Sequence, residues 1–288
     1  QLMRATTTKA LMIHTAYDLG NPGPDYNHGW GLLDIQAAAK MIRSYADGAE
    51  GRSIREDRLF PNAPNDARDY SYQAPGDEDL RVTLVWDDVR GDRQDNDSHA
   101  PVLKNNLHLR VVDESGTTHH PYVMPYVTGT ESKDPFASDL FDANATTGVN
   151  NTDNVLQVVL PNAAAGTYTV EVDYTGSLDN DWEQPFSLVV SGMESAEGPS
   201  TPEITSFDAD TVQESDLPFT LSGSGFMLGS QVLLRRIDAG EVPLTKATVF
   251  PDGITGRLNV LDLDPGYWDV IVRNPDGQQA ILKNGYLV

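Results

Sequence analysis

The sequence contains no cysteine among its 288 residues. That absence excludes disulfides, thiol catalysis and cysteine-ligated metal sites. No run of about 20 apolar residues occurs, so we expect no membrane insertion. Basic residues are also scarce, since 20 lysines and arginines stand against 43 acids and leave a net charge of −23. A chain this acidic repels nucleic-acid phosphates, and we therefore expect no nucleic-acid partner.

The start of the chain has helical character without a core of its own. Apolar residues crowd 10–17 and 35–42, and the run Gly-Asn-Pro-Gly-Pro at 20–24 separates the two stretches. Asp34 is placed to cap the second helix. Two short helices cannot bury their apolar faces on each other alone. We expect residues 1–45 to pack on the β-domain that follows or on a neighbouring molecule, or to be mobile, and His14 to pack against a body outside the chain.

The segment 46–78 is polar and contains three prolines, which predicts a connector that wraps a surface. Alternation of apolar and polar residues then predicts antiparallel strands. We place these strands at 80–86, 107–112, 155–160, 168–172 and 186–190. They predict a sandwich of jelly-roll type over 79–193.

A linker over 194–201 precedes a second β unit at 202–288. Its predicted strands are 219–222, 231–234, 247–250, 257–260, 268–272 and 280–282. The sequence Asn-Pro-Asp-Gly at 274–277 predicts the tight hairpin between the last two. Strands this closely spaced predict an immunoglobulin-like domain. The expected fold class is mainly β, with two β-sandwich domains preceded by a short helical segment.

Three stretches near the start form a series of motifs. They are Lys-Ala-Leu-Met-Ile-His-Thr-Ala at 9–16, Tyr-Asn-His-Gly-Trp-Gly-Leu-Leu-Asp at 26–34, and Ile-Gln-Ala-Ala at 35–38. Together they resemble the end of the catalytic domain of subtilisin-like serine peptidases, the subtilases or peptidase family S8. Order and spacing both fit the family. The resemblance implies that 1–45 is the helical remnant of an α/β catalytic domain. We expect Gly29 and Gly31 to let the backbone pass closely under Trp30.

The two β units also resemble parts of that family. Residues 80–192 are similar to the sandwich that follows the catalytic domain, through Leu-Val-Trp-Asp at 84–87 and Leu-Lys-Asn-Asn-Leu-His-Leu at 103–109. Asn106 and His108 stand where the family usually has acids, which argues against an ion at those positions. The second unit has Gly-Ser-Gly-Phe at 223–226, Gly-Tyr-Trp-Asp-Val at 266–270 and Asn-Pro-Asp-Gly at 274–277. Through these motifs, residues 202–288 resemble the IPT/TIG group of immunoglobulin-like modules.

The resemblance implies a parent endopeptidase whose Asp-His-Ser triad is not in this chain. The Gly-Thr-Ser-Met-Ala, His-Gly-Thr and Asp-Thr/Ser-Gly motifs are absent, and His28 precedes Gly29-Trp30 instead. The chain begins at Gln1 without a leader, so we expect these motifs upstream. The implied partners are the upstream catalytic domain and the polypeptide substrate of the parent, with a secreted or cell-surface location. We expect the chain alone to hydrolyse nothing.

A second interpretation is a non-catalytic adhesion or polymer-binding module of a cell-surface protein. Residues 9–39 separate the two interpretations, because an adhesin needs no helix pair of this kind, whereas a subtilase ends in one.

Calcium is the cofactor that the acidic loops suggest. Calcium takes six to eight oxygens from flexible loops, several of them carboxylates. The candidate ligands are Asp87, Asp95, Asp97, Asp142 and Asp153. The alternative is a salt-bridged surface loop, since Arg90 and Arg93 lie within the first segment. His119 and His120 are neighbours on an expected strand end, so their side chains point to opposite faces and no shared metal is expected.

Overall fold

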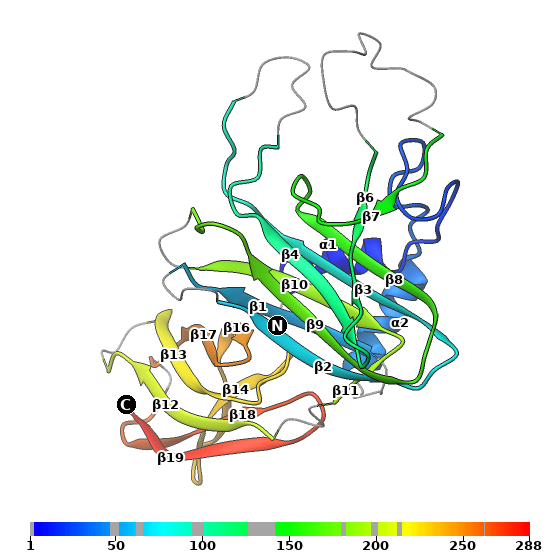
Figure 1. Ribbon diagram of the computed structural model, residues 1–288. Coiled ribbons are helices and arrows are strands. Elements are labelled where there is room, and N and C mark those ends of the chain that lie inside the picture. The colour runs from blue at the N-terminus through cyan, green and yellow to red at the C-terminus, as the bar shows by residue number, and fades with distance from the viewer. Residues whose placement is uncertain are drawn as a thin grey trace.

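Two β-sandwiches and two short helices make up the protein, as the computed structural model in Figure 1 shows. The structure describes residues 3–46, 52–61, 66–93, 101–125, 142–179, 183–196, 201–211, 215–261 and 263–288. The predicted class, mainly β with sandwich architecture, is confirmed. Within these ranges no helix is long and apolar enough to cross a membrane.

The first sandwich packs a four-stranded sheet on a five-stranded one. The four-stranded sheet has the order β1-β10-β3-β8, and the other has the order β11-β2-β9-β4-β5. The bounds are β1 (Arg52–Leu59), β2 (Arg68–Ala74), β3 (Glu78–Trp86), β4 (Leu107–Asp113), β5 (Thr118–His119), β8 (Val155–Ala163), β9 (Gly166–Tyr174), β10 (Gln184–Ser191) and β11 (Glu194–Ser195). A small pair, β6 (Tyr122–Val123) and β7 (Thr146–Thr147), lies beside it.

The centre of the four-stranded sheet is buried on both faces. Along β3, Val82, Leu84 and Trp86 enter the core between the sheets, and their neighbours Thr83 and Val85 are equally buried on the opposite face. The indole of Trp86 donates to the Asn105 carbonyl at 3.0 Å. A strand buried on both faces needs a third layer above it.

The helices α1 (Ala5–His14) and α2 (Ile35–Ala46) supply that third layer. Ala10 and Leu11 of α1 and Met41 of α2 pack with Val85 and Val189. Figure 1 shows both helices on the outer face of the β1-β10-β3-β8 sheet, away from the five-stranded sheet. Of the three arrangements expected for 1–45, the structure shows the first, packing of the two helices on the following sandwich.

Buried polar contacts fix both ends of α1 on the sheet. Near its start, Thr7 donates to the Glu56 carboxylate of β1 and lies 2.9 Å from the Ser187 hydroxyl of β10. At its end, the His14 ring contacts the hydroxyls of Thr83 and Ser191, both at 2.9 Å. The expectation that His14 packs on a body outside the chain is wrong, because these hydroxyls of the sandwich satisfy both of its ring nitrogens.

Two of the expected boundaries differ from the structure. The segment 46–78 is not a surface connector, since β1 pairs with β10, and β2 pairs with β9 in the opposite sheet. Tyr70 and Tyr72 of β2 point into the core. The expected linker also starts too early, because β11 pairs with β2.

The second sandwich, over 203–288, packs two four-stranded sheets of order β12-β13-β17-β16 and β15-β14-β18-β19. The bounds are β12 (Glu203–Ala209), β13 (Leu217–Ser224), β14 (Gln231–Arg236), β15 (Gly240–Pro243), β16 (Thr245–Phe250), β17 (Gly253–Leu258), β18 (Tyr267–Arg273) and β19 (Gln279–Leu287). The predicted 274–277 hairpin is confirmed, with the Gly277 N–H donating to the Asn274 carbonyl at 3.0 Å. Trp268 fills the core.

The two sandwiches are in direct contact. The Leu228 N–H of the second donates to the Tyr45 hydroxyl of α2 at 3.0 Å, and burial raises the pKa of Tyr45 to about 12. Arg58 of β1 reaches Phe250 and Asp252 beyond the end of β16. The second domain is therefore held against the first by side chains as well as by the chain connection.

Candidate functional site

The turn between the two helices is closed by a pair of backbone hydrogen bonds. Tyr17 and Leu32 exchange N–H···O bonds of 2.8 Å each, which joins the end of α1 to the start of α2. Gly31 has φ +96°, and a Cβ there would lie 2.3 Å from the Tyr17 carbonyl oxygen. Only glycine fits that approach. Gly29 needs its positive φ of +60° but has open space around it, so its role is conformational alone.

Asp34 begins α2 as predicted. Its carboxylate accepts from the Ala37 N–H at 2.8 Å, and its carbonyl accepts the first helical hydrogen bond from Ala38. This is N-cap geometry, so the Asp34 prediction is confirmed.

A buried carboxylate organises the middle of the turn. Asp25 accepts from the backbone N–H groups of Asn21, Asn27 and His28 at 3.0, 2.8 and 2.6 Å. Burial alone raises the pKa of Asp25, but hydrogen bonds from His28, Asn21 and Asn27 outweigh it and lower the pKa below its usual value. The ionised carboxylate therefore holds the turn in one conformation.

The turn between the helices also contacts the first sandwich. The Tyr26 hydroxyl donates to the Pro125 carbonyl at 2.6 Å, and the Asn21 side-chain amide donates to the Asp142 carbonyl at 3.0 Å. A Cβ on Gly23 would lie 2.8 Å from the Tyr122 ring. These contacts fix the position of the turn relative to the first sandwich.

This well-positioned turn exposes large apolar side chains. Six of the thirteen exposed large hydrophobic residues found in the described ranges lie within 12–35; they are Met12, Tyr17, Tyr26, Leu32, Leu33 and Ile35. Ile35 is 71% exposed and Leu32 is 60% exposed. Tyr17 and Leu32 are directly opposite in the backbone pair, so their side chains share a face. We call these six residues the apolar turn face.

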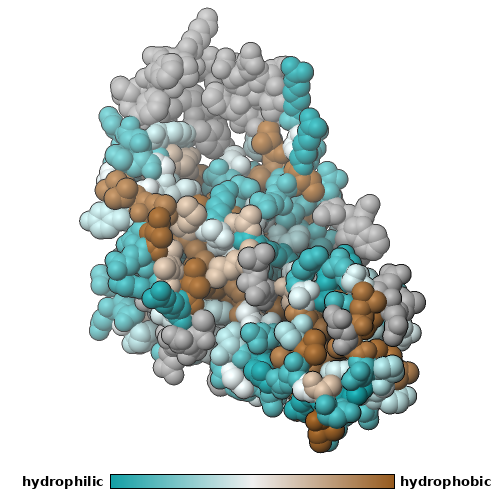
Figure 2. Space-filling model, turned by 180° about the vertical axis from the view of Figure 1, so that it is seen from behind, coloured by the Kyte–Doolittle hydropathy of each residue, from teal (hydrophilic) through white to brown (hydrophobic). Residues whose placement is uncertain are grey.

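The space-filling view shows apolar side chains gathered along the edge of the molecule that carries the helices (Figure 2). Soluble proteins rarely leave such a concentration of large apolar groups exposed unless it meets a partner. The apolar turn face is therefore the candidate interaction site. The adjacent leucines next to a Gly-Trp-Gly turn were visible in the sequence, but their exposure was not.

Of the five predicted calcium ligands, the structure describes Asp87, Asp142 and Asp153. Asp87 is exposed after β3, and its carbonyl accepts from the Gln184 side-chain amide at 3.0 Å. Asp142 is exposed beside Asn21. Asp153 accepts from the Asn150 side chain at 2.7 Å. Asp95 and Asp97 lie outside the described residues.

No group of three or more histidine or acidic side chains suited to a metal ion occurs in the described ranges. Asn106 instead donates to the Asn151 side chain at 2.9 Å, and His108 lies 3.2 Å from Asp173. Asp88, which was not singled out from the sequence, has a structural role. Its carboxylate accepts from the N–H groups of Lys104 and Asn105 at 2.7 and 2.9 Å, which ties the end of β3 to the approach of β4.

Comparison with known proteins adds little. No protein-family model matches the sequence, and no curated protein does. A GH2 β-galacturonidase from Eisenbergiella tayi is similar over 81% of this chain and 43% of its own, at 8% identity and a TM-score of 0.21. A DUF4785 family protein from Legionella pneumophila is similar over 82% of this chain and 64% of its own, at 8% identity and a TM-score of 0.21.

The glycoside hydrolase domain of Endo-D from Streptococcus pneumoniae is similar over 82% of this chain and 37% of its own, at 10% identity and a TM-score of 0.21. The chain therefore spans less than two thirds of each of these proteins. Likenesses at this TM-score carry no argument about fold or function.

Proposed function

We propose that this chain is the C-terminal accessory region of a secreted subtilisin-like serine endopeptidase, with the catalytic domain docked on the apolar turn face. The chain supplies the closing helices of the catalytic domain and a sandwich that supports them. Proteolysis belongs to the parent polypeptide, because the triad motifs are absent from this sequence.

The apolar turn face is the observation that carries this proposal. It lies within the segment 9–39, whose motifs resemble the end of a subtilase catalytic domain. The helix pair is buried on one side against the sandwich, and the turn that joins the helices exposes large apolar side chains to solvent. Exposed apolar surface of this kind commonly marks an interaction site. The sandwich covers the inner side through Leu11 and Met41. The catalytic domain is the partner that the motifs imply for the outer side.

The contacts beneath the helices suggest what the sandwich does for the parent. Thr7 and His14, at the two ends of α1, are both hydrogen-bonded to β-strands. A helix fixed at both ends presents its outer surface in one orientation. Docking on a pre-positioned surface loses less conformational freedom than docking on a mobile helix pair. The sandwich therefore stabilises the catalytic domain by ordering its last two helices.

Hydrogen–deuterium exchange tests the docking. Backbone amides in 12–35 are expected to exchange more slowly in the parent polypeptide than in this chain alone, because the catalytic domain covers them there. Peptides containing Tyr267 and Leu287 of the second sandwich, which are also exposed, provide the control and should exchange equally in both. Equal exchange of 12–35 in the two proteins would contradict the proposal.

A substitution provides an independent check. Ile35→Glu should leave this chain as stable as the wild type, because Ile35 is 71% exposed. In the parent the same change places a charge in an apolar interface and should lower its stability by about 2 kcal/mol or more. A parent that tolerates Ile35→Glu as well as this chain does would favour the adhesion or polymer-binding alternative.

A further inference from the structure

A cleft opens where the end of α1, one flank of α2 and the end of β10 meet. It has a volume of about 510 Å³. The residues that line it are His14, Thr15, Ala37, Lys40, Met41, Arg43, Ser44 and Ser191. None of these eight is acidic, although the whole sequence has 43 acids and 20 lysines and arginines. The side chains that line the cleft thus include basic but no acidic residues, although the protein as a whole is strongly acidic.

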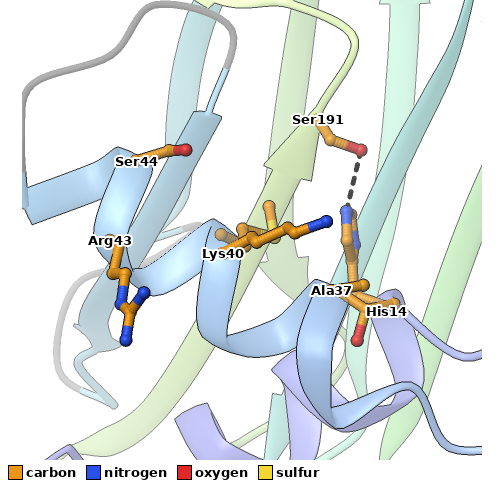
Figure 3. Close-up of a pocket in the computed structure, with 8 residues that line it drawn as sticks. His14, Ala37, Lys40, Arg43, Ser44 and Ser191 are labelled. Atoms are coloured by element: carbon orange, nitrogen blue, oxygen red, sulfur yellow. Dashed lines mark hydrogen bonds between the residues drawn. The ribbon is translucent and has the colours of Figure 1, made fainter.

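Two cations of α2 stand at this cleft. Lys40 and Arg43 are three residues apart, so they lie on neighbouring positions of one helix face. Both are exposed, and neither forms an ion pair with any residue that the structure describes. Figure 3 shows the Lys40 ammonium extending across the cleft toward the His14 ring and the Ser191 hydroxyl.

The floor of the cleft is a chain of hydrogen bonds that starts in the sheet. The Gln157 side-chain amide donates to the Thr83 hydroxyl at 2.9 Å. Thr83 Oγ1 lies 2.9 Å from His14 Nδ1, and His14 Nε2 lies 2.9 Å from Ser191 Oγ. Because the Thr83 hydroxyl already accepts from Gln157, we assign it as the donor to His14 Nδ1, which leaves the ring proton on Nε2, directed at Ser191. The Ser191 hydroxyl then keeps its own proton for a group in the cleft.

The end of α1 does not oppose a negative ligand. A helix C-terminus carries partial negative charge. Here the Arg81 guanidinium donates to the His14 carbonyl at 2.6 Å and offsets that charge. Among the other lining residues, Ala37 and Met41 are apolar, whereas Thr15 and Ser44 are polar. The cleft therefore combines an ammonium group, a hydroxyl donor and an aliphatic wall.

We propose that this cleft binds a carboxylate that has a short apolar body, either a small organic acid or the C-terminal carboxylate of a peptide. Lys40 pairs with the carboxylate, Ser191 donates to it, and Ala37 contacts the body. The inorganic phosphate ion fits less well because it leaves the apolar wall without a partner. The inference stands on these residues alone and is independent of the proposed parent peptidase.

Titration of the ¹⁵N-labelled full chain at constant ionic strength tests this site. The probes are propionate, acetyl-Ala-Ala with a free carboxylate, the same dipeptide as its C-terminal amide, and inorganic phosphate. Resonances of His14 and Ser191 should shift with the two carboxylates and not with the amide. Tighter binding of the dipeptide assigns a peptide terminus, and equal or tighter binding of propionate assigns a small acid. Three results would overturn the proposal. The dipeptide amide could bind as tightly as the dipeptide acid, phosphate could bind as tightly as the carboxylates, or no probe could shift the resonances.

Substitutions that remove the same charge at two different lysines test whether carboxylate binding depends on Lys40 itself. Lys40→Gln should weaken carboxylate binding about tenfold, the loss expected for one charge-assisted hydrogen bond. Lys40→Arg should retain most of the affinity because it restores the charge. Lys283→Gln removes the same charge from an exposed site on β19 and should change nothing. Equal losses in Lys40→Gln and Lys283→Gln would mean attraction by the general field of the protein and would overturn the site. Since Lys40 is exposed, an unchanged melting temperature in each variant shows that folding is intact.

Discussion

The guanidinium of Arg58 lies over the ring of Phe250, with 3.9 Å between its central carbon and the ring centroid. Arg58 belongs to the first sandwich and Phe250 to the second, so this contact crosses the domain junction. The same guanidinium pairs with Glu183 at 2.8 Å and with Asp252 at 3.0 Å. Arg4 lies over the same ring at 4.4 Å. One buried phenylalanine thus receives two cations from the first domain.

Arg58→Ala should loosen this junction without unfolding either sandwich. A desolvated cation–π contact contributes about 2 kcal/mol, and the exposed partner Asp252 adds little. We expect a larger radius of gyration by small-angle X-ray scattering and a splitting of the calorimetric transition in two. The matched control is Arg235→Ala, which removes an ion pair with Asp269 inside the second sandwich. A scattering profile that Arg58→Ala leaves unchanged would show that other contacts hold the domains.

Leu11→Ala should destabilise the first sandwich strongly. Leu11 is 2% exposed and packs under α1 against the sheet, so its loss leaves a cavity worth about 2–5 kcal/mol. The adjacent Met12 is 42% exposed on the same helix. Met12→Ala should therefore cost no more than about 0.5 kcal/mol. Urea denaturation monitored by Trp86 fluorescence measures both. Similar losses for the two variants would mean that α1 does not pack as described.

The sequence predicted the strands whose apolar residues alternate, and it missed the rest for definable reasons. β2 reads Arg-Asp-Tyr-Ser-Tyr-Gln-Ala, whose alternation was present but short, and three prolines nearby favoured a connector. β1 gave no such signal. Glu56 and Asp57 are buried within it, where Glu56 accepts from the Thr7 hydroxyl of α1 and Asp57 accepts from the Tyr70 hydroxyl. Buried acids that depend on distant partners cannot be recognised from local pattern.

Asp25→Asn should reveal a pH-dependent contribution from the turn. Because the folded pKa of Asp25 is lowered, its carboxylate adds stability at neutral pH, and that contribution is lost as the pH falls through the folded pKa. The difference in melting temperature between wild type and Asp25→Asn should therefore be largest near neutral pH and shrink below the usual pKa of an aspartate. Asp142→Asn, at an exposed neighbouring position, is the control and should show no such trend. A difference that stays constant with pH would exclude this role for the charge.

Calcium binding by the acidic loops remains a prediction. If the loop with Asp87, Asp95 and Asp97 or the region of Asp142 and Asp153 binds the ion, calcium should raise the melting temperature more than magnesium does. Asp97→Asn should then abolish the calcium-specific shift. A shift that is equal for both ions reflects screening of the −23 net charge instead.

The candidate site shows the same division between what the sequence predicts and what it does not. The Gly-Trp-Gly turn and the Asp34 cap were predictable because they depend on local conformation. The exposure of Leu32 and Ile35 depends on which side of the turn the sandwich covers. The approach of Lys40 to His14 and Ser191 depends on how two helices and a strand meet. Neither relationship is encoded in a local spacing.

Fluorophosphonate labelling distinguishes a peptidase parent from a non-catalytic one, because the reagent reacts covalently with the activated serine of serine hydrolases. An antibody raised against this chain identifies the polypeptide that carries it in the culture medium and at the cell surface. The account predicts that a longer polypeptide recognised by the antibody is labelled, and that this chain alone is not. Labelling of the chain alone, or a carrier polypeptide that resists labelling under conditions that label a control subtilase, would contradict the account.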